Sequence, residues 1–258
     1  MEDMVSQSLK DRFPPSHWIL LDDLSKILND LSQKSEPMFS YSPTHDLVQF
    51  YNGYIDFALS IYVDKFKQMY RALAESLERE WYIVYAQSGR SIIENTATLR
   101  YYARHKDFNE AKENCQHDRM DKKTIMHAIE TLDRFVRGNR FSWEAFIEGR
   151  FDELSKTPHQ ENLAQVNIRT CLDHWFKDSP TIENLYDLLC DLVHPNFGSN
   201  MLVMRSLRGE LVAGGTDGKT VSLFIVCPTL AGIVGAYKEI QENLLRFDLL
   251  KLAYDHDG

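Results

Sequence analysis

Apolar residues recur every three or four positions along most of this chain. Such spacing places one face of a helix against a core. Two long helices followed by shorter ones are typical of a helical bundle. Ahead of residue 177 the pattern predicts four such helices, one opening at Ser42-Pro43-Thr44 and continuing to residue 77, and others over about 80–105, 122–136 and 163–176.

A further helix is predicted to begin near Ser179-Pro180 and to end at His194. Leu185, Tyr186 and Leu189 fall on its apolar side, whereas Asp191 and His194 fall on the opposite side. Pro195 disfavours helical geometry at His194, so the imidazole is expected at the last turn, where the helix dipole favours a cation. Acid–base chemistry is possible there, although an ordinary surface helix ending in His-Pro has the same pattern.

β-prone residues gather after this helix, in LVMRSLRGELVAGGTDGKTVSLFIV. They predict a hairpin over about 202–226, with the glycines at 214, 215 and 218 in its turn. These glycines lead into a predicted strand and lack the Walker pattern, which argues against an NTPase phosphate loop. Apolar spacing resumes over about 228–254 and predicts a last helix.

The sequence therefore predicts a mainly all-α protein, a helical bundle with a small β-hairpin inserted before its last helix. Prolines at 14, 15, 37 and 43 bracket a short helical segment over 22–31. We interpret residues 1–43 as an amino-terminal helical appendage and residues 44–258 as the bundle.

The chain is acidic, with 38 Asp and Glu against 29 Lys and Arg, for a net charge of -9. Strong sequence-independent binding to nucleic acid requires basic residues that neutralise the phosphates. The negative net charge therefore argues against such binding. Any contact with RNA is expected to be local, at the basic stretches 90–106 or 134–150. Solvated helix faces would produce the same two stretches.

The amino terminus has acidic residues and no apolar run, and no stretch approaches 18 continuous apolar residues. We therefore expect a soluble, cytoplasmic protein without a membrane partner. The four cysteines, at 115, 171, 190 and 227, lack the paired spacing of zinc sites or redox motifs. They are expected to be reduced and mostly buried, and no cofactor is predicted.

Charged residues on the 80–105 helix need partners. Arg90 and Glu94 are four residues apart and are expected to pair. Arg100 projects close to the apolar face, so it should meet a carboxylate from another helix, such as Asp187 or Asp191. This contact is either a structural clamp or part of a site.

The bundle, the IIENTATLRYY helix and the YDLLCDLVHPN segment before a final helix resemble HEPN proteins, particularly a poorly characterised bacterial branch with the HPN ending. The resemblance covers roughly residues 50–250. Catalytic members of that superfamily are metal-independent ribonucleases that often dimerise, and many belong to toxin–antitoxin or antiviral systems. The resemblance therefore implies a homodimer that acts on RNA in bacterial defence.

The chain departs from the HEPN pattern, which places an arginine a few residues before the histidine. No arginine occurs between Arg169 and Arg205. Our hypothesis is that Arg100 or Arg90 reaches His194 from the neighbouring helix and binds phosphate, while His194 acts as acid and base. Residues expected to position these groups are Glu94, Asn95, Asp191 and Asn196.

Two alternative interpretations of the sequence remain open. The stripe of Asp187, Asp191 and His194 has spacing that would suit a metal ion, although a solvated acidic face looks the same in sequence. The chain is alternatively a non-catalytic interaction or regulatory protein that acts through a protein partner. A non-catalytic role explains both the acidic net charge and the missing arginine.

Overall fold

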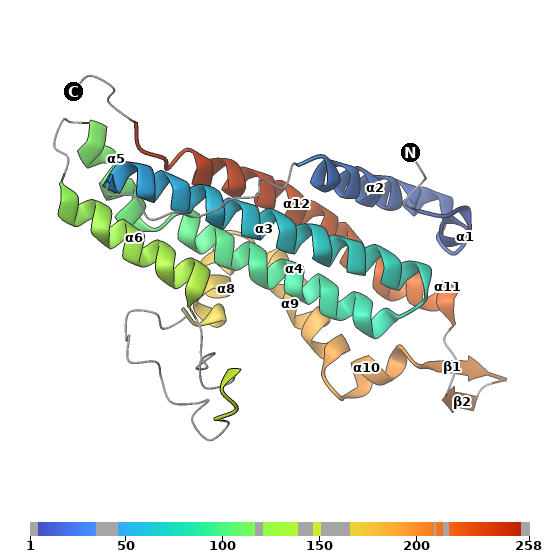
Figure 1. Cartoon of the computed structure of the whole chain (residues 1–258). Coiled ribbons are helices and arrows are strands. Elements are labelled where there is room, and N and C mark those ends of the chain that lie inside the picture. Colours follow the sequence, from blue (N-terminus) through green and yellow to red (C-terminus); the bar gives the residue numbers. More distant parts are fainter. Residues whose placement is uncertain are drawn as a thin grey trace.

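The computed structural model describes residues 5–34, 46–116, 121–138, 147–150, 166–208, 210–213 and 217–253. These ranges are mainly helical, which confirms the all-α bundle with a small hairpin (Figure 1). The elements are α1 (Gln7–Lys10), η1 (Pro15–His17), α2 (Trp18–Gln33), α3 (Leu47–Glu78), α4 (Tyr82–Ala103), α5 (Lys106–Gln116), α6 (Lys122–Arg137), α8 (Ile168–Phe176), α9 (Pro180–Val193), α10 (Phe197–Met201), β1 (Met204–Leu207), β2 (Glu210–Ala213), α11 (Gly218–Val221), η4 (Ser222–Val226) and α12 (Cys227–Asp248).

The three longest helices, α3, α4 and α12, run side by side along the molecule (Figure 1). The apolar face predicted for α4 is buried as expected. Buried hydroxyls connect the three helices, because Tyr70 of α3 donates to the Ile233 carbonyl at 3.0 Å and Tyr85 of α4 lies 2.8 Å from Thr229 Oγ1. Large aromatic side chains can occupy this core because each hydroxyl has a partner.

The amino-terminal helices pack on this core. Leu21, Leu24 and Leu31 of α2 are fully buried, and they belong to the same hydrophobic cluster as α3 and α12. Asp30 of α2 also accepts a hydrogen bond from the Tyr237 hydroxyl on α12. The predicted appendage therefore shares the core of the bundle.

The predicted hairpin is shorter than expected. Among the described residues only β1 and β2 pair, in an antiparallel register that joins Leu207 to Glu210, and Arg208 takes a positive φ of 53° in the tight turn between them. Residues 219–226, expected to form the second strand, are helical and continue into α12. Burial explains this difference, because Val221 and Val226 pack in the core, where β propensity has little weight.

Some predicted boundaries lie outside the described residues. They include the helix start at Ser42-Pro43-Thr44, the segment 163–165 and the glycines at 214 and 215. Where the chain is described again, α3 begins at Leu47 with Asp46 capping its first turn through the Gln49 amide, 2.9 Å away.

The helix over Gly218–Asp248 is long and apolar enough, by length and composition alone, to cross a membrane. Half of its apolar window is buried inside the protein. Core helices of soluble bundles have the same composition, so the absence of a membrane partner stays a prediction.

Candidate functional site

His194 lies at the end of α9, as the sequence predicts. Pro180 occupies the first turn of this helix, and His194 follows its last residue with extended backbone angles (ψ 150°). The His194 amide still donates to the Cys190 carbonyl at 3.0 Å, while its imidazole is exposed to solvent. Within the described ranges no side-chain hydrogen bond reaches this ring, which leaves it free for proton transfer.

Asp191 and Asn196 fix the chain on either side of His194. Asn196 Nδ2 donates to Asp191 Oδ1 at 2.6 Å, and Asn196 forms a reciprocal capping box with Ser199 at the start of α10. Gly198 packs so closely that an added Cβ would lie 2.1 Å from Asp191 Oδ2 and 2.9 Å from the Asp191 carbonyl oxygen. These residues hold α10 against the end of α9 and so orient the His194 segment.

Arg90 and Glu94 pair on α4, as predicted, and α9 adds a third member. Glu94 Oε1 accepts from Arg90 Nε at 2.9 Å and from the Tyr186 hydroxyl at 3.0 Å. Burial and the charge of Glu94 raise the pKa of Tyr186, so its hydroxyl stays protonated and acts as a donor. The Arg90 guanidinium also lies over the Tyr186 ring, 5.8 Å from its centroid.

The antiparallel packing of α4 and α9 decides which arginine lies on the His194 side. Glu94 pairs with Tyr186, and five residues earlier on α4 Gly89 faces Leu189. Arg90 therefore lies beside the middle of α9, at Tyr186 and Cys190, and His194 follows the end of the same helix. Of the two candidate arginines, Arg90 lies closer to the His194 end of α9, and Tyr186, which its guanidinium overlies, precedes His194 by eight residues.

Arg100 lies at the other end of α9 and forms a structural clamp. Its buried guanidinium donates to Asp178, just before α9, and to Glu239 Oε1 of α12 at 2.7 Å. The fourteen residues of α9, about 21 Å of helix, separate Asp178 from His194. The prediction that Arg100 pairs with Asp187 or Asp191 is wrong. Because α4 and α9 are antiparallel, Arg100 lies beside the start of α9, whereas Asp187 and Asp191 lie in its second half.

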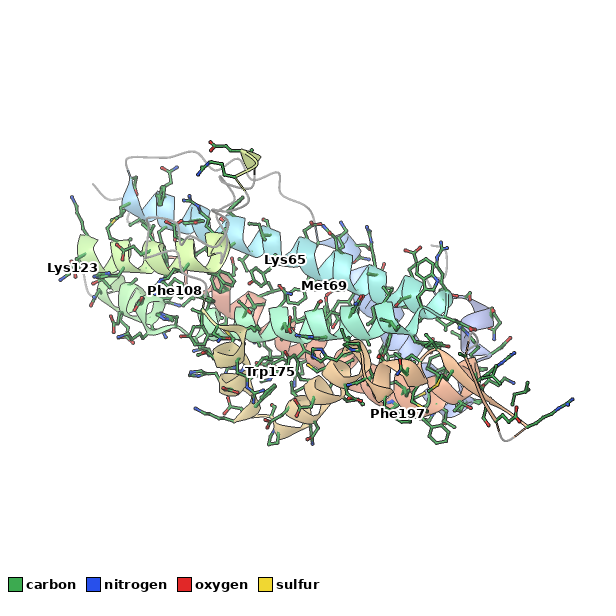
Figure 2. All side chains as sticks on the ribbon, turned by 90° about the horizontal axis from the view of Figure 1, so that it is seen from below. Lys65, Met69, Phe108, Lys123, Trp175 and Phe197 are labelled. Atoms are coloured by element: carbon green, nitrogen blue, oxygen red, sulfur yellow. The ribbon has the colours of Figure 1, made fainter. Side chains whose placement is uncertain are left out.

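Asn95 faces α3, on a different side of α4 from the Arg90 network. Its amide nitrogen donates to the Ser91 carbonyl at 2.9 Å and approaches Met69 Sδ at 3.7 Å. Figure 2 shows Met69 on α3, in the space between α3 and α4. Asn95 is therefore separated from the face of α9 that carries Tyr186.

The acidic stripe of α9 does not form a metal-binding cluster. Asp187 is exposed, and the Asp191 carboxylate already accepts a hydrogen bond from the Asn196 amide. In the described part of the chain no three His, Cys, Asp or Glu side chains gather as metal ligands would. Cys171 and Cys227 are buried free thiols, as expected, while Cys190 is partly exposed next to Arg90.

No protein-family profile, curated protein or solved structure matches this chain. The HEPN resemblance therefore stays a prediction that rests on the residues of α4 and α9.

Sequence reasoning missed the part that Tyr186 takes in this network. Its helical position marks it as a core residue, and it is buried as expected, but its hydroxyl reaches Glu94 on another helix. The four-residue step from Tyr186 to the partly exposed Cys190 was the available signal, because it puts Tyr186 at the edge of the apolar face, within reach of a polar group on another helix.

The buried ion pairs of Arg100 predict that two arginines differ in how much they stabilise the protein. Arg100→Ala leaves two carboxylates without their buried partner and should lower the free energy of unfolding by about 3 kcal/mol. Arg169→Ala is the matched control, because Arg169 pairs with Asp173 at an exposed position and should cost at most about 1 kcal/mol. Urea unfolding followed by circular dichroism measures both, and equal losses would contradict the clamp.

The contact at Gly198 gives a second prediction. Gly198→Ala forces α10 away from Asp191 and should destabilise the protein by about 1–3 kcal/mol. Gly235→Ala is the control, because nothing lies within 4 Å of a Cβ there, and alanine in a helix should be neutral or stabilising by about 1 kcal/mol. Thermal unfolding of the two variants tests this difference, and a Gly198→Ala protein as stable as wild type would refute the close packing.

Proposed function

We propose that this chain is a HEPN-like, metal-independent endoribonuclease of a bacterial defence or toxin–antitoxin type. The observation that carries the proposal is the position of Arg90, beside Tyr186 and Cys190 on the helix that ends at His194. A neighbouring helix thus supplies the arginine that the His194 helix lacks. The resemblance also implies that the enzyme works as a homodimer.

The chemistry requires one proton carrier and one cation. His194 takes the proton from a ribose 2′ hydroxyl and returns a proton to the leaving oxygen, while Arg90 stabilises the charge that builds on the phosphate. Glu94 accepts from Arg90 Nε, which leaves the terminal amino groups of the guanidinium available to the phosphate. Asp191, Asn196 and Tyr186 position these two groups, and Arg100 keeps a structural role.

Cleavage of total RNA and of tRNA in the presence of a chelator tests the proposal. His194→Ala and Arg90→Ala should each lower the rate about 100-fold or more while circular dichroism shows an unchanged fold. His127→Ala is the matched control, because His127 is an exposed histidine on α6 that pairs only locally with Glu130, and its activity should equal wild type.

Three outcomes would contradict the proposal. Cleavage that requires a divalent metal would assign a different mechanism. Equal cleavage by wild type and His194→Ala would exclude His194 as the proton carrier. No cleavage by folded wild-type protein would favour the second candidate function.

The second candidate is a non-catalytic protein that acts through a protein partner, and exposed apolar side chains favour it. Phe197 of α10 and Phe224 of η4 are 69% and 70% exposed, and Met201, Val203, Leu207 and Leu223 are also exposed. Figure 1 places α10, the hairpin and α11 at one end of the bundle, and Figure 2 shows Phe197 at the outer edge. Concentrated apolar exposure is a feature of protein interfaces.

Light scattering after size-exclusion chromatography tests whether this end joins two copies. If it does, the wild-type protein is a dimer at micromolar concentration, and the double variant Phe197→Ser, Phe224→Ser is a monomer with an unchanged helical spectrum. Leu245→Ser is the control, because Leu245 is 61% exposed near the end of α12 that lies away from α10 and the hairpin, and its loss should not alter assembly. A monomeric wild type, or a dimer that the double variant preserves, would exclude this surface as the homodimer interface.

A further inference from the structure

A pocket of about 370 Å³ lies where the end of α4, the start of α5 and the turn between α8 and α9 meet. Its walls combine cations, a carboxylate and an aromatic ring, and they include Tyr101, Arg104, His105, Lys106, His174 and Asp178. The fourteen residues of α9 separate Asp178 from His194, and Figure 1 shows α8 at the opposite end of α9 from α10. The pocket is therefore distinct from the candidate ribonuclease site, and its volume suits a small organic molecule.

Three cationic side chains of this pocket are exposed to solvent and retain donors for a ligand. Lys106 and His174 make no hydrogen bond or ion pair with another described residue. Arg104 makes two long contacts with carboxylates, at 3.7 Å to Asp178 and 3.3 Å to Glu239. These side chains come from α4, α5 and α8, so they approach the pocket from three directions.

The charge of Arg104 is incompletely balanced within the protein. Arg100 already makes the shorter contacts with both carboxylates, Asp178 and Glu239. Burial lowers the pKa of Arg104, and the charges of Arg100 and Arg246 lower it further, against the opposing effect of the two carboxylates. An anion beside Arg104 would relieve this repulsion. The pocket is thus a local positive site on a chain whose net charge is -9.

The same pocket offers an acceptor and an aromatic surface. Both Arg100 and Arg104 contact Oδ2 of Asp178, so its Oδ1 is left to accept from a hydroxyl group. The Tyr101 ring is in edge contact with the rings of His105 and His174, at centroid distances of 5.9 and 5.3 Å. The negative face of an aromatic ring attracts C–H groups. A ligand that carries both hydroxyl and C–H groups uses these two walls together.

We propose that this pocket binds a small sugar phosphate. Arg104, Lys106 and His174 bind the phosphate, Asp178 accepts from the sugar hydroxyls, and the Tyr101 ring packs against the C–H groups of the sugar. Donors from three helices favour a phosphate, whose three free oxygens accept from several directions, over a carboxylate with two oxygens. Asp178 repels a ligand that is anionic throughout, whereas a hydroxylated group beside the phosphate makes use of it. This binding is independent of RNA cleavage.

Isothermal titration calorimetry with glucose 6-phosphate tests the proposal. Arg104→Gln and Lys106→Gln should each weaken binding at least about tenfold, because each removes a charge-assisted hydrogen bond to the phosphate. Lys177→Gln is the matched control, since Lys177 is an exposed lysine three residues after His174 that does not line the pocket, and its affinity should equal wild type. Circular dichroism checks that all three variants keep the helical fold.

Ligand variants identify what each wall binds. Glucose, inorganic phosphate and ethyl phosphate should each bind at least about tenfold more weakly than glucose 6-phosphate, because each lacks either the phosphate or the hydroxyl groups. Failure of glucose 6-phosphate to bind the wild-type protein at millimolar concentration would overturn the proposal, as would equal affinity of wild type, Arg104→Gln and Lys106→Gln.

Two further measurements separate this pocket from RNA and from the candidate ribonuclease site. A short single-stranded RNA should not displace glucose 6-phosphate, and displacement at a lower RNA concentration would assign the pocket to RNA instead. His194→Ala should bind glucose 6-phosphate as wild type does, so the sugar phosphate site stands or falls separately from the ribonuclease proposal.

Discussion

The burial of α4 among four other helices is the constraint on which the rest of the structure depends. It packs against α3, α8, α9 and α12, so few of its side chains face water. A polar group in such a helix must find a partner inside the protein. Thr96 satisfies this requirement within its own turn, by donating to the Ile92 carbonyl at 2.7 Å, while Tyr85, Glu94 and Arg100 reach α12, α9 and the start of α9.

The partner that each polar residue of α4 finds decides whether that residue only stabilises the fold or can also bind a ligand. Arg100 is held by carboxylates from two directions, so it secures helices and has little freedom to bind a ligand. Arg90 is partly exposed and gives only its Nε to Glu94, which preserves its capacity to bind an anion. The two arginines look equally suitable in the sequence, and the direction in which α9 crosses α4 distinguishes them.

The unpaired hydroxyl of Tyr102 is an exception on a helix whose other buried polar groups are satisfied. Its neighbours on α4 show that the fold is able to pair such groups, which makes the exception informative. Tyr102 lines a cleft together with Glu94, so this cleft and the Arg90 network share one helix.

Local chemistry allowed the sequence alone to determine most of the helices. Periodic apolar residues marked the buried face of α4 and α9, Pro180 and Pro195 marked the two ends of α9, and four-residue spacing paired Arg90 with Glu94. The sequence failed at 219–226, where apolar, β-prone residues form a partly buried helix, because periodicity does not distinguish a strand from a helix in a short apolar run. It also failed on the partners of Arg100 and Tyr186. Those partners lie 78 and 92 residues away, and only the antiparallel packing of whole helices brings them within hydrogen-bond distance.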